Sequence, residues 1–136
     1  MRNSNLILIV TAILVASSTV SAEDLPTKDC GNSGGTMLQI NYCAAEQFKL
    51  ADDKLNSLFK KKMAALETVK VKNWLRDSQR AWISFRDSTC LYEAGPQQES
   101  GSVWPLEYYQ CMERHTRYRN EDLESYISCD TPDCPN

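Results

Sequence analysis

Six cysteines and a single histidine are the side chains in this sequence best suited to covalent or metal chemistry. Cys111 and His115 lie four positions apart, so on a helix they share a face and could offer two ligands to a zinc ion. The chain has only this one histidine and no Cys-x-x-Cys pair, which argues against zinc. In a small exported protein, such cysteines are typical of disulfides. We therefore predict disulfide bonds, no metal site and no cofactor.

The positions of the cysteines favour one set of pairs. One cysteine in the initial loop can fold back onto the first helix, two flank the connection at residues 91–110, and the last two enclose a short turn. A bond between Cys43 and Cys90 is the alternative, because a helical hairpin would bring these two residues nearly level. The favoured disulfides are Cys30–Cys43, Cys90–Cys111 and Cys129–Cys134.

The first residues predict export. Arg2 precedes the apolar run LILIVTAILVA, and small residues follow up to Ala22, which is the pattern of a secretory signal peptide at residues 1–22. The run is short for a transmembrane helix, although a retained membrane anchor is the alternative. We expect a periplasmic or secreted protein that is not bound to a membrane after cleavage.

The size and charge of the remaining chain limit its partners. The sequence has 15 Lys and Arg residues against 18 Asp and Glu residues, a mild acidity that argues against nucleic acids and anionic membranes and favours a basic partner. The size suits one domain stabilised by disulfides. We predict a single helical domain at residues 23–136, with its core at 30–127 and a disulfide-closed tail at 128–136.

Apolar residues recur at steps of three and four along most of this domain, and strand-like alternation is absent. A capping-box pattern at Thr36 opens the first helix, and the weak helix formers Thr68 and Val69 favour a turn after it. Glycines and prolines predict a loop from Gly95 to Pro105. The predicted fold is all-α, with an antiparallel helical hairpin at about 36–66 and 70–94 and a third helix at about 105–127.

One arginine lies on a helix stripe that should be buried. In the segment QRAWISFRDSTC, residues 79–90, helical spacing puts Trp82, Phe85 and Arg86 on one side. If the hairpin turns near residue 68, Asp52 of the first helix is roughly level with Arg86. Asp52 can then neutralise the arginine, while the aromatic rings exclude water. A binding or catalytic role for this cluster is the alternative.

A longer motif surrounds this cluster and continues into the third helix. It reads Ala51-Asp52-x-x-Leu55-Asn56, then Gln79-Arg80-Ala81-Trp82-Ile83-x-Phe85-Arg86-Asp87-x-x-Cys90, then Gly101-Ser102, then Cys111, and finally Thr116-x-x-Arg119-x-x-x-Leu123. Over about residues 30–127 the chain closely resembles the LprI-type lysozyme inhibitor family. It departs from the family at Phe59 and Phe85, where tyrosines are usual, at Ser100, where a second glycine is common, and in its added cysteine tail.

The resemblance implies a small, exported, all-helical, disulfide-bonded protein, with lysozyme inhibition as its activity. The polar and aromatic residues of the motif are expected to have structural roles. These residues are Asp52, Asn56, Gln79, Trp82, Arg86, Asp87, Thr116 and Arg119.

The loop between the second and third helices is the predicted contact with lysozyme. A lysozyme cleft is lined by carboxylates, so a protein inhibitor needs a narrow projection that can donate hydrogen bonds there. The competing interpretation is structural, with Gly101 and Ser102 shaping a turn and Trp104 and Tyr108 capping the core. The candidate lysozyme-binding residues are Gln97, Gln98, Glu99, Ser100, Gly101, Ser102 and Trp104.

We expect a binding protein and not an enzyme. The chain has no Gly-rich phosphate loop, and its histidine has no obvious nucleophile near it in sequence. Carboxylates such as Asp52 and Asp87 lie beside arginines that would keep them ionised. The expected partner is a lysozyme or a similar cell-wall hydrolase. The alternative is an immunity or envelope-stress protein that binds another exported toxin or cell-wall enzyme.

Overall fold

The computed structural model describes residues 30–31, 35–129 and 134. The predicted signal peptide at residues 1–22 lies outside these residues, as do positions 130–133 of the predicted tail. The described residues form α-helices and a short 3-10 turn, and they include no β-strand. The all-α prediction is therefore confirmed.

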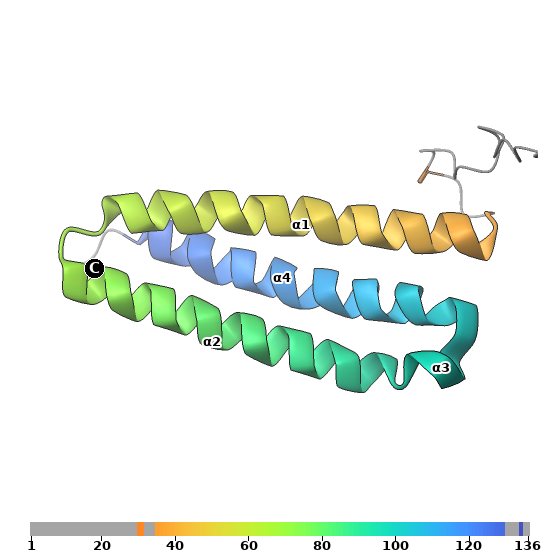
Figure 1. Ribbon diagram of the computed structural model, residues 1–136. Coiled ribbons are helices and arrows are strands. Elements are labelled where there is room, and N and C mark those ends of the chain that lie inside the picture. Colours follow the sequence, from red (N-terminus) through yellow and green to blue (C-terminus); the bar gives the residue numbers. More distant parts are fainter. Residues whose placement is uncertain (1–29, 32–34, 130–133, 135–136) are drawn as a thin grey trace, which may run out of the picture.

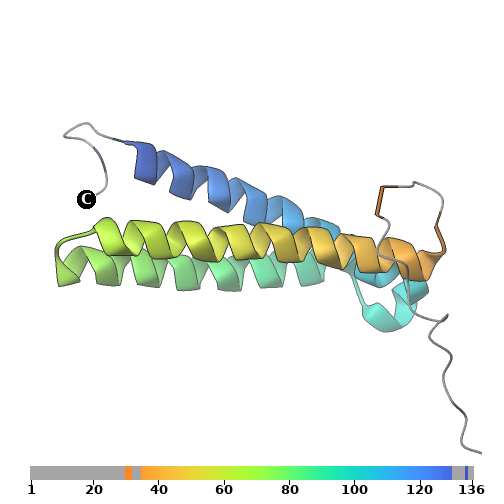
Figure 2. The ribbon, with the colours of Figure 1, turned by 90° about the horizontal axis from the view of Figure 1, so that it is seen from above.

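Three long helices build the molecule, and they follow one another in up-down-up order (Figure 1). The chain runs along α1, returns antiparallel along α2, and runs along α4 in the direction of α1. Helix α4 lies between α1 and α2 in Figure 1 and to one side of both in Figure 2. It packs more extensively against α1 than against α2. Each predicted helix end lies within one residue of the observed end. The bounds are Met37–Ala65 for α1, Val69–Ala94 for α2 and Trp104–Ser128 for α4.

Side chains and backbone conformation explain where the first two helices begin and end. The Thr36 hydroxyl accepts a hydrogen bond from the Gln39 amide at 3.3 Å, and the Thr68 hydroxyl accepts one from the Val71 amide at 3.3 Å. Each bond satisfies an amide that the first turn of a helix leaves unpaired. At the other end of α2, Gly95 has φ of 69°, a conformation that favours glycine. These local signals define the hairpin.

The segment predicted as a loop is partly helical, which corrects the prediction. Gln97–Ser100 forms the short helix α3, and Gly101–Val103 forms a 3-10 turn. The Ser100 hydroxyl donates to the carbonyl oxygens of Ala94 at 3.3 Å and Pro96 at 3.1 Å, which stabilises the turn. A helix of one turn is too short to produce an apolar period, so the sequence showed only its glycines and prolines.

The three predicted disulfides are confirmed, and the alternative bond between Cys43 and Cys90 is wrong. Cys90 and Cys111 are buried and join α2 to α4, with Met112 beside them and Phe48 and Tyr108 packed against the cluster. No helix in the described part of the chain is both long and apolar enough to cross a membrane. The bonds are Cys30–Cys43, Cys90–Cys111 and Cys129–Cys134.

Candidate functional site

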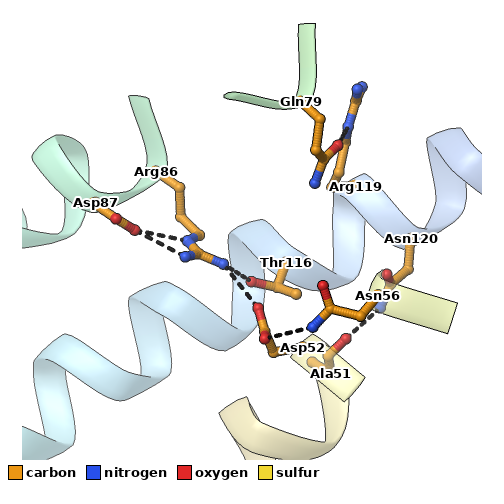
Figure 3. Close-up of polar contacts among 9 residues, drawn as sticks. All are labelled: Ala51, Asp52, Asn56, Gln79, Arg86, Asp87, Thr116, Arg119 and Asn120. Atoms are coloured by element: carbon orange, nitrogen blue, oxygen red, sulfur yellow. Dashed lines mark hydrogen bonds and ion pairs between the residues drawn. The ribbon is translucent and has the colours of Figure 1, made fainter. Parts of the chain in front are cut away.

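Arg86 of α2 lies at the centre of a polar network that joins the three long helices (Figure 3). Its Nη1 donates hydrogen bonds to Asp52 Oδ1 of α1 at 3.3 Å and to Thr116 Oγ1 of α4 at 3.2 Å. Its Nε donates to Asp87 Oδ1 at 2.9 Å. The prediction that Asp52 pairs with Arg86 is confirmed, and Asp87 and Thr116 complete the set of partners.

Two carboxylates share this one guanidinium. The Arg86 side chain is 8% exposed, whereas those of Asp52 and Asp87 are 35% and 45% exposed. The guanidinium is therefore removed from water while both carboxylates keep part of their hydration. Pairing and hydrogen bonding offset the cost of burying the cation. Because Asp52 belongs to α1 and Thr116 to α4, their bonds to Arg86 hold the three long helices in one register.

Arg119 of α4 makes a second joint with α2. Its Nε donates to Gln79 Oε1 at 3.0 Å, and its Nη1 donates to Asp122 Oδ2 at 3.3 Å. The Trp82 ring centroid lies 5.1 Å from Cζ of Arg86 and 6.0 Å from Cζ of Arg119, within the range of a cation–π contact. Trp82 thus connects the two arginine joints.

The aromatic cover of Arg86 differs from the prediction at one residue. Phe85 is 56% exposed, and its ring meets His115 edge-on with the centroids 5.7 Å apart. Phe48 of α1 covers the guanidinium in its place, with its ring centroid 5.4 Å from Arg86 Cζ. Neighbouring residues on a helix are rotated by about 100°, so Phe85 points to the side when Arg86 points inward.

Two asparagines extend the network along α1. Asn56 Nδ2 donates to Asp52 Oδ2 at 3.0 Å, which helps to orient the carboxylate that receives Arg86. Asn120 is buried, and its Nδ2 donates to the Ala51 carbonyl oxygen at 3.0 Å. The sequence reasoning missed Asn120. Its spacing of four from Thr116, on the same helix face, was the available signal.

The predicted lysozyme-binding residues all lie at one end of the bundle, opposite the turn between α1 and α2. We call residues 35–48 and 87–113 together the α3 end. In Figure 2 the short α3 helix bulges from the bundle there. Gln97, Gln98 and Glu99 are exposed, as are Gly101 and Ser102, whereas Ser100 and Trp104 are partly buried.

Hydrogen bonds and ring stacking hold the segment from Gly95 to Trp104, which we call the α3 segment, against its neighbours. Trp104 Nε1 donates to the Gly95 carbonyl oxygen at 2.8 Å, and the Trp104 ring stacks on Tyr108 with centroids 4.8 Å apart. Asn41 Nδ2 of α1 donates to the Ser102 carbonyl oxygen at 2.8 Å. Burial raises the pKa of the Tyr108 hydroxyl, and its neighbour Asp87 raises it further. Trp104 and Ser102 are thus engaged within the bundle, whereas the exposed side chains of α3 face solvent.

The α3 end carries almost purely acidic charge. Residues 87–113 contain five carboxylates and no lysine or arginine, and residues 35–48 add Glu46. At the opposite end, residues 60–72 contain five lysines and one glutamate. Charge is therefore separated along the bundle, although the net charge of the chain is small. The five carboxylates are Asp87, Glu93, Glu99, Glu107 and Glu113.

The described residues form two hollows at the α3 end. The larger, of about 570 Å³, lies between α1 and α4, and the smaller, of about 460 Å³, lies beside the α3 segment. Amide and carboxylate side chains can offer hydrogen bonds in the larger hollow, whereas the smaller has an amide but no carboxylate in its lining. The polar side chains are Gln39, Gln47, Gln110 and Glu113 in the larger hollow and Gln97, Tyr92 and Trp104 in the smaller.

The sequence of the chain is similar to one protein family and to known bacterial proteins. A family model described as "Lysozyme inhibitor LprI" matches residues 29–123. The protein R02472 of Rhizobium meliloti (strain 1021) is 27% identical over 130 residues, covering 87% of this chain and 91% of the relative. The protein YecT of Escherichia coli (strain K12) is 31% identical over 100 residues, covering 64% of this chain and 62% of the relative. Both relatives are described as uncharacterized, and no solved structure matches the chain.

Proposed function

The chain belongs to the LprI lysozyme inhibitor family, and from this premise we propose that it is an exported inhibitor that binds a lysozyme and blocks its active-site cleft. The α3 end is the proposed contact surface. Inhibition by this route needs binding alone, because a covered cleft cannot admit the glycan substrate.

The acidic charge of the α3 end is the observation that carries the proposal, because it would complement a cationic lysozyme. At the α3 end Asp87 and Glu93 pair with the flanking Arg86 and Arg114, whereas Glu99 and Glu107 form no ion pair among the described residues. Opposite charges speed association and orient two proteins. The exposed Glu99 and Glu107 would meet the basic rim of the cleft. The amides of Gln97 and Gln98 would donate hydrogen bonds to the carboxylates inside it.

The order of the α3 segment also favours binding. A segment that is already held in place loses less conformational entropy when it meets a partner. Here the Trp104 indole donates a hydrogen bond to the Gly95 carbonyl oxygen, and the Asn41 amide donates one to the Ser102 carbonyl oxygen. The α3 residues are thus presented from an anchored base.

Lysis of cell-wall substrate is the direct test of the proposed activity. We expect oxidised protein comprising residues 23–136 to slow lysis, and the double change Gln97→Ala with Gln98→Ala to weaken inhibition by roughly tenfold or more, as loss of a central contact does. Both glutamines are exposed, so helical content and thermal midpoint should stay unchanged. Trp104 is less suitable for this test, because its indole donates a hydrogen bond to the Gly95 carbonyl oxygen and its loss would disturb the α3 segment itself.

A matched pair of charge variants tests the surface itself. Glu99→Gln with Glu107→Gln should weaken inhibition and reduce its dependence on salt, because screened attractions are removed. Glu67→Gln with Glu121→Gln removes equal charge from exposed positions outside the α3 end and should have little effect. Equal losses from both pairs would refute the α3 end as the contact.

A different result would count against inhibition altogether. Undiminished lysis at a large molar excess of oxidised protein, with more than one class of lysozyme, would contradict the proposal. It would favour the alternative partner, another exported toxin or cell-wall enzyme.

A further inference from the structure

The buried cysteine pair has two further potential ligands beside it. Cys90, Cys111 and His115 each offer one ligand atom, and these three atoms lie within 4.8 Å of one another. Glu93 Oε1 lies 3.9 Å from His115 Nε2. We propose that, before the Cys90–Cys111 disulfide forms, the two thiolates bind a zinc ion together with His115 and Glu93.

Helix geometry brings the four ligands together in pairs. Cys90 and Glu93 are three apart on α2, and Cys111 and His115 are four apart on α4, so each pair projects from one helix face. Two sulfurs, one imidazole nitrogen and one carboxylate oxygen form a ligand set that suits tetrahedral zinc. The site would join α2 to α4 at the place where the disulfide joins them in the oxidised protein.

The imidazole of His115 is available to a metal. Its Nε2 is buried and has no hydrogen-bond partner, although a buried polar nitrogen normally has one. The His115 ring packs edge-on against the Phe85 ring, and this contact helps to hold the imidazole in place. A metal ion would satisfy a nitrogen that no protein group satisfies.

Glu93 is oriented for the same role. Arg114 donates a hydrogen bond to Oε2 of Glu93, which leaves Oε1 on the side of His115. Outer partners of this kind commonly position the ligands of a metal site. With Cys90 and Cys111 as thiolates, the three anionic ligands exceed the charge of Zn²⁺ by one, and the Arg114 guanidinium offsets the remainder.

Zinc and the disulfide exclude each other. Binding of Zn²⁺ releases one proton from each of the two thiols, whereas disulfide formation releases the same two protons and also gives two electrons to an oxidant. In a zinc site with Zn–S bonds of about 2.3 Å, the two sulfurs cannot remain bonded to each other. The proposed site therefore belongs only to the reduced chain, where it would hold α2 against α4 until oxidation replaces it.

The test isolates the two cysteines in the chain of residues 23–136. The other four, Cys30, Cys43, Cys129 and Cys134, are replaced with serine. A water-soluble phosphine reduces the remaining disulfide, taking oxygen from water while the two sulfurs gain the electrons and protons. The reduced protein should bind one Zn²⁺ per chain, show a rise in thermal midpoint with zinc, and show the visible absorption of tetrahedral thiolate coordination with Co²⁺. The oxidised protein should show none of these.

Ligand variants decide whether the site is the proposed one. His115→Ala and Glu93→Gln should each lower zinc affinity by at least about tenfold, whereas the exposed Glu107→Gln should leave it unchanged. Equal affinity in the His115→Ala variant would overturn the proposal, as would binding by the oxidised protein. If the four-serine chain does not fold, the same comparison is made on the reduced chain with all six cysteines. There, loss of one bound zinc ion on changing His115 supports the site, and an unchanged number contradicts it.

Discussion

Removing both carboxylates from Arg86 should destabilise the protein far more than removing either one. In the single variants Asp52→Asn and Asp87→Asn, the guanidinium keeps its other carboxylate and the Thr116 hydroxyl. The carboxylates are 35% and 45% exposed, so water screens each pair. We expect each single change to lower the free energy of unfolding by about 1 to 2 kcal/mol.

The double variant leaves a buried cation without an anionic partner. Arg86 is 8% exposed, and a buried charge that loses its counter-ion typically costs about 3 to 5 kcal/mol. The double loss should thus exceed the sum of the single losses by about 1 kcal/mol. Adding Arg86→Met to the double variant should recover stability, because an apolar chain of similar length can pack against Phe48 and Trp82.

Urea unfolding followed by circular dichroism measures these free energies. Asp53→Asn is the matched control, since Asp53 neighbours Asp52 but forms an exposed pair with Lys49, whose loss should have little effect on stability. Additive losses at Asp52 and Asp87, or no recovery with Arg86→Met, would refute the reasoning that the two carboxylates share one buried cation.

Three further changes test other parts of the structure. Replacing Cys90 and Cys111 together with serine should cost roughly 2 to 5 kcal/mol in urea unfolding, and a change near zero would show that the bond adds little to the packing. Gly95→Ala should cost about 1 to 3 kcal/mol, because φ of 69° strains a side chain, and an unchanged thermal midpoint would argue against that conformation. Burial raises the pKa of Tyr108 above its ordinary value of 10.0, so its contribution to stability is complete below that pH and is lost as pH rises through the folded pKa. Tyr108→Phe should therefore flatten the alkaline fall in unfolding free energy, and an equal slope in both proteins would contradict this.

Local sequence patterns were enough to predict the three long helices and to favour the observed disulfide pairs. Thr36 and Thr68 are capping residues whose hydrogen bonds reach only three positions along the chain. Cys90 and Cys111 flank a short connection, so their pairing follows once the two adjacent helices are antiparallel. The contact of Asp52 with Arg86 was also predictable, because it needs only the position of the hairpin turn and the rise of a helix.

The structure of the α3 segment could not be predicted from local sequence patterns. Its candidate residues could be proposed as a projection, yet the short helix and the hydrogen bond from Trp104 to Gly95 depend on side-chain placement that a glycine-rich and proline-rich pattern does not encode. The sequence pattern likewise does not state that Gln97 is exposed while Trp104 is partly buried.

The sequence by itself determined the all-helical class and the bounds of the three long helices, and it favoured the observed cysteine pairs over the alternative, because these depend on interactions between residues close in the chain or on adjacent helices. The tertiary structure decided which polar residues are covered. Lys62, within a run of lysines, is buried and donates to the Tyr126 carbonyl oxygen 64 positions away, and Asn120 donates to Ala51 69 positions away. Both contacts exist because α4 packs along α1, and no periodic pattern within either helix states which side of the hairpin the third helix will occupy.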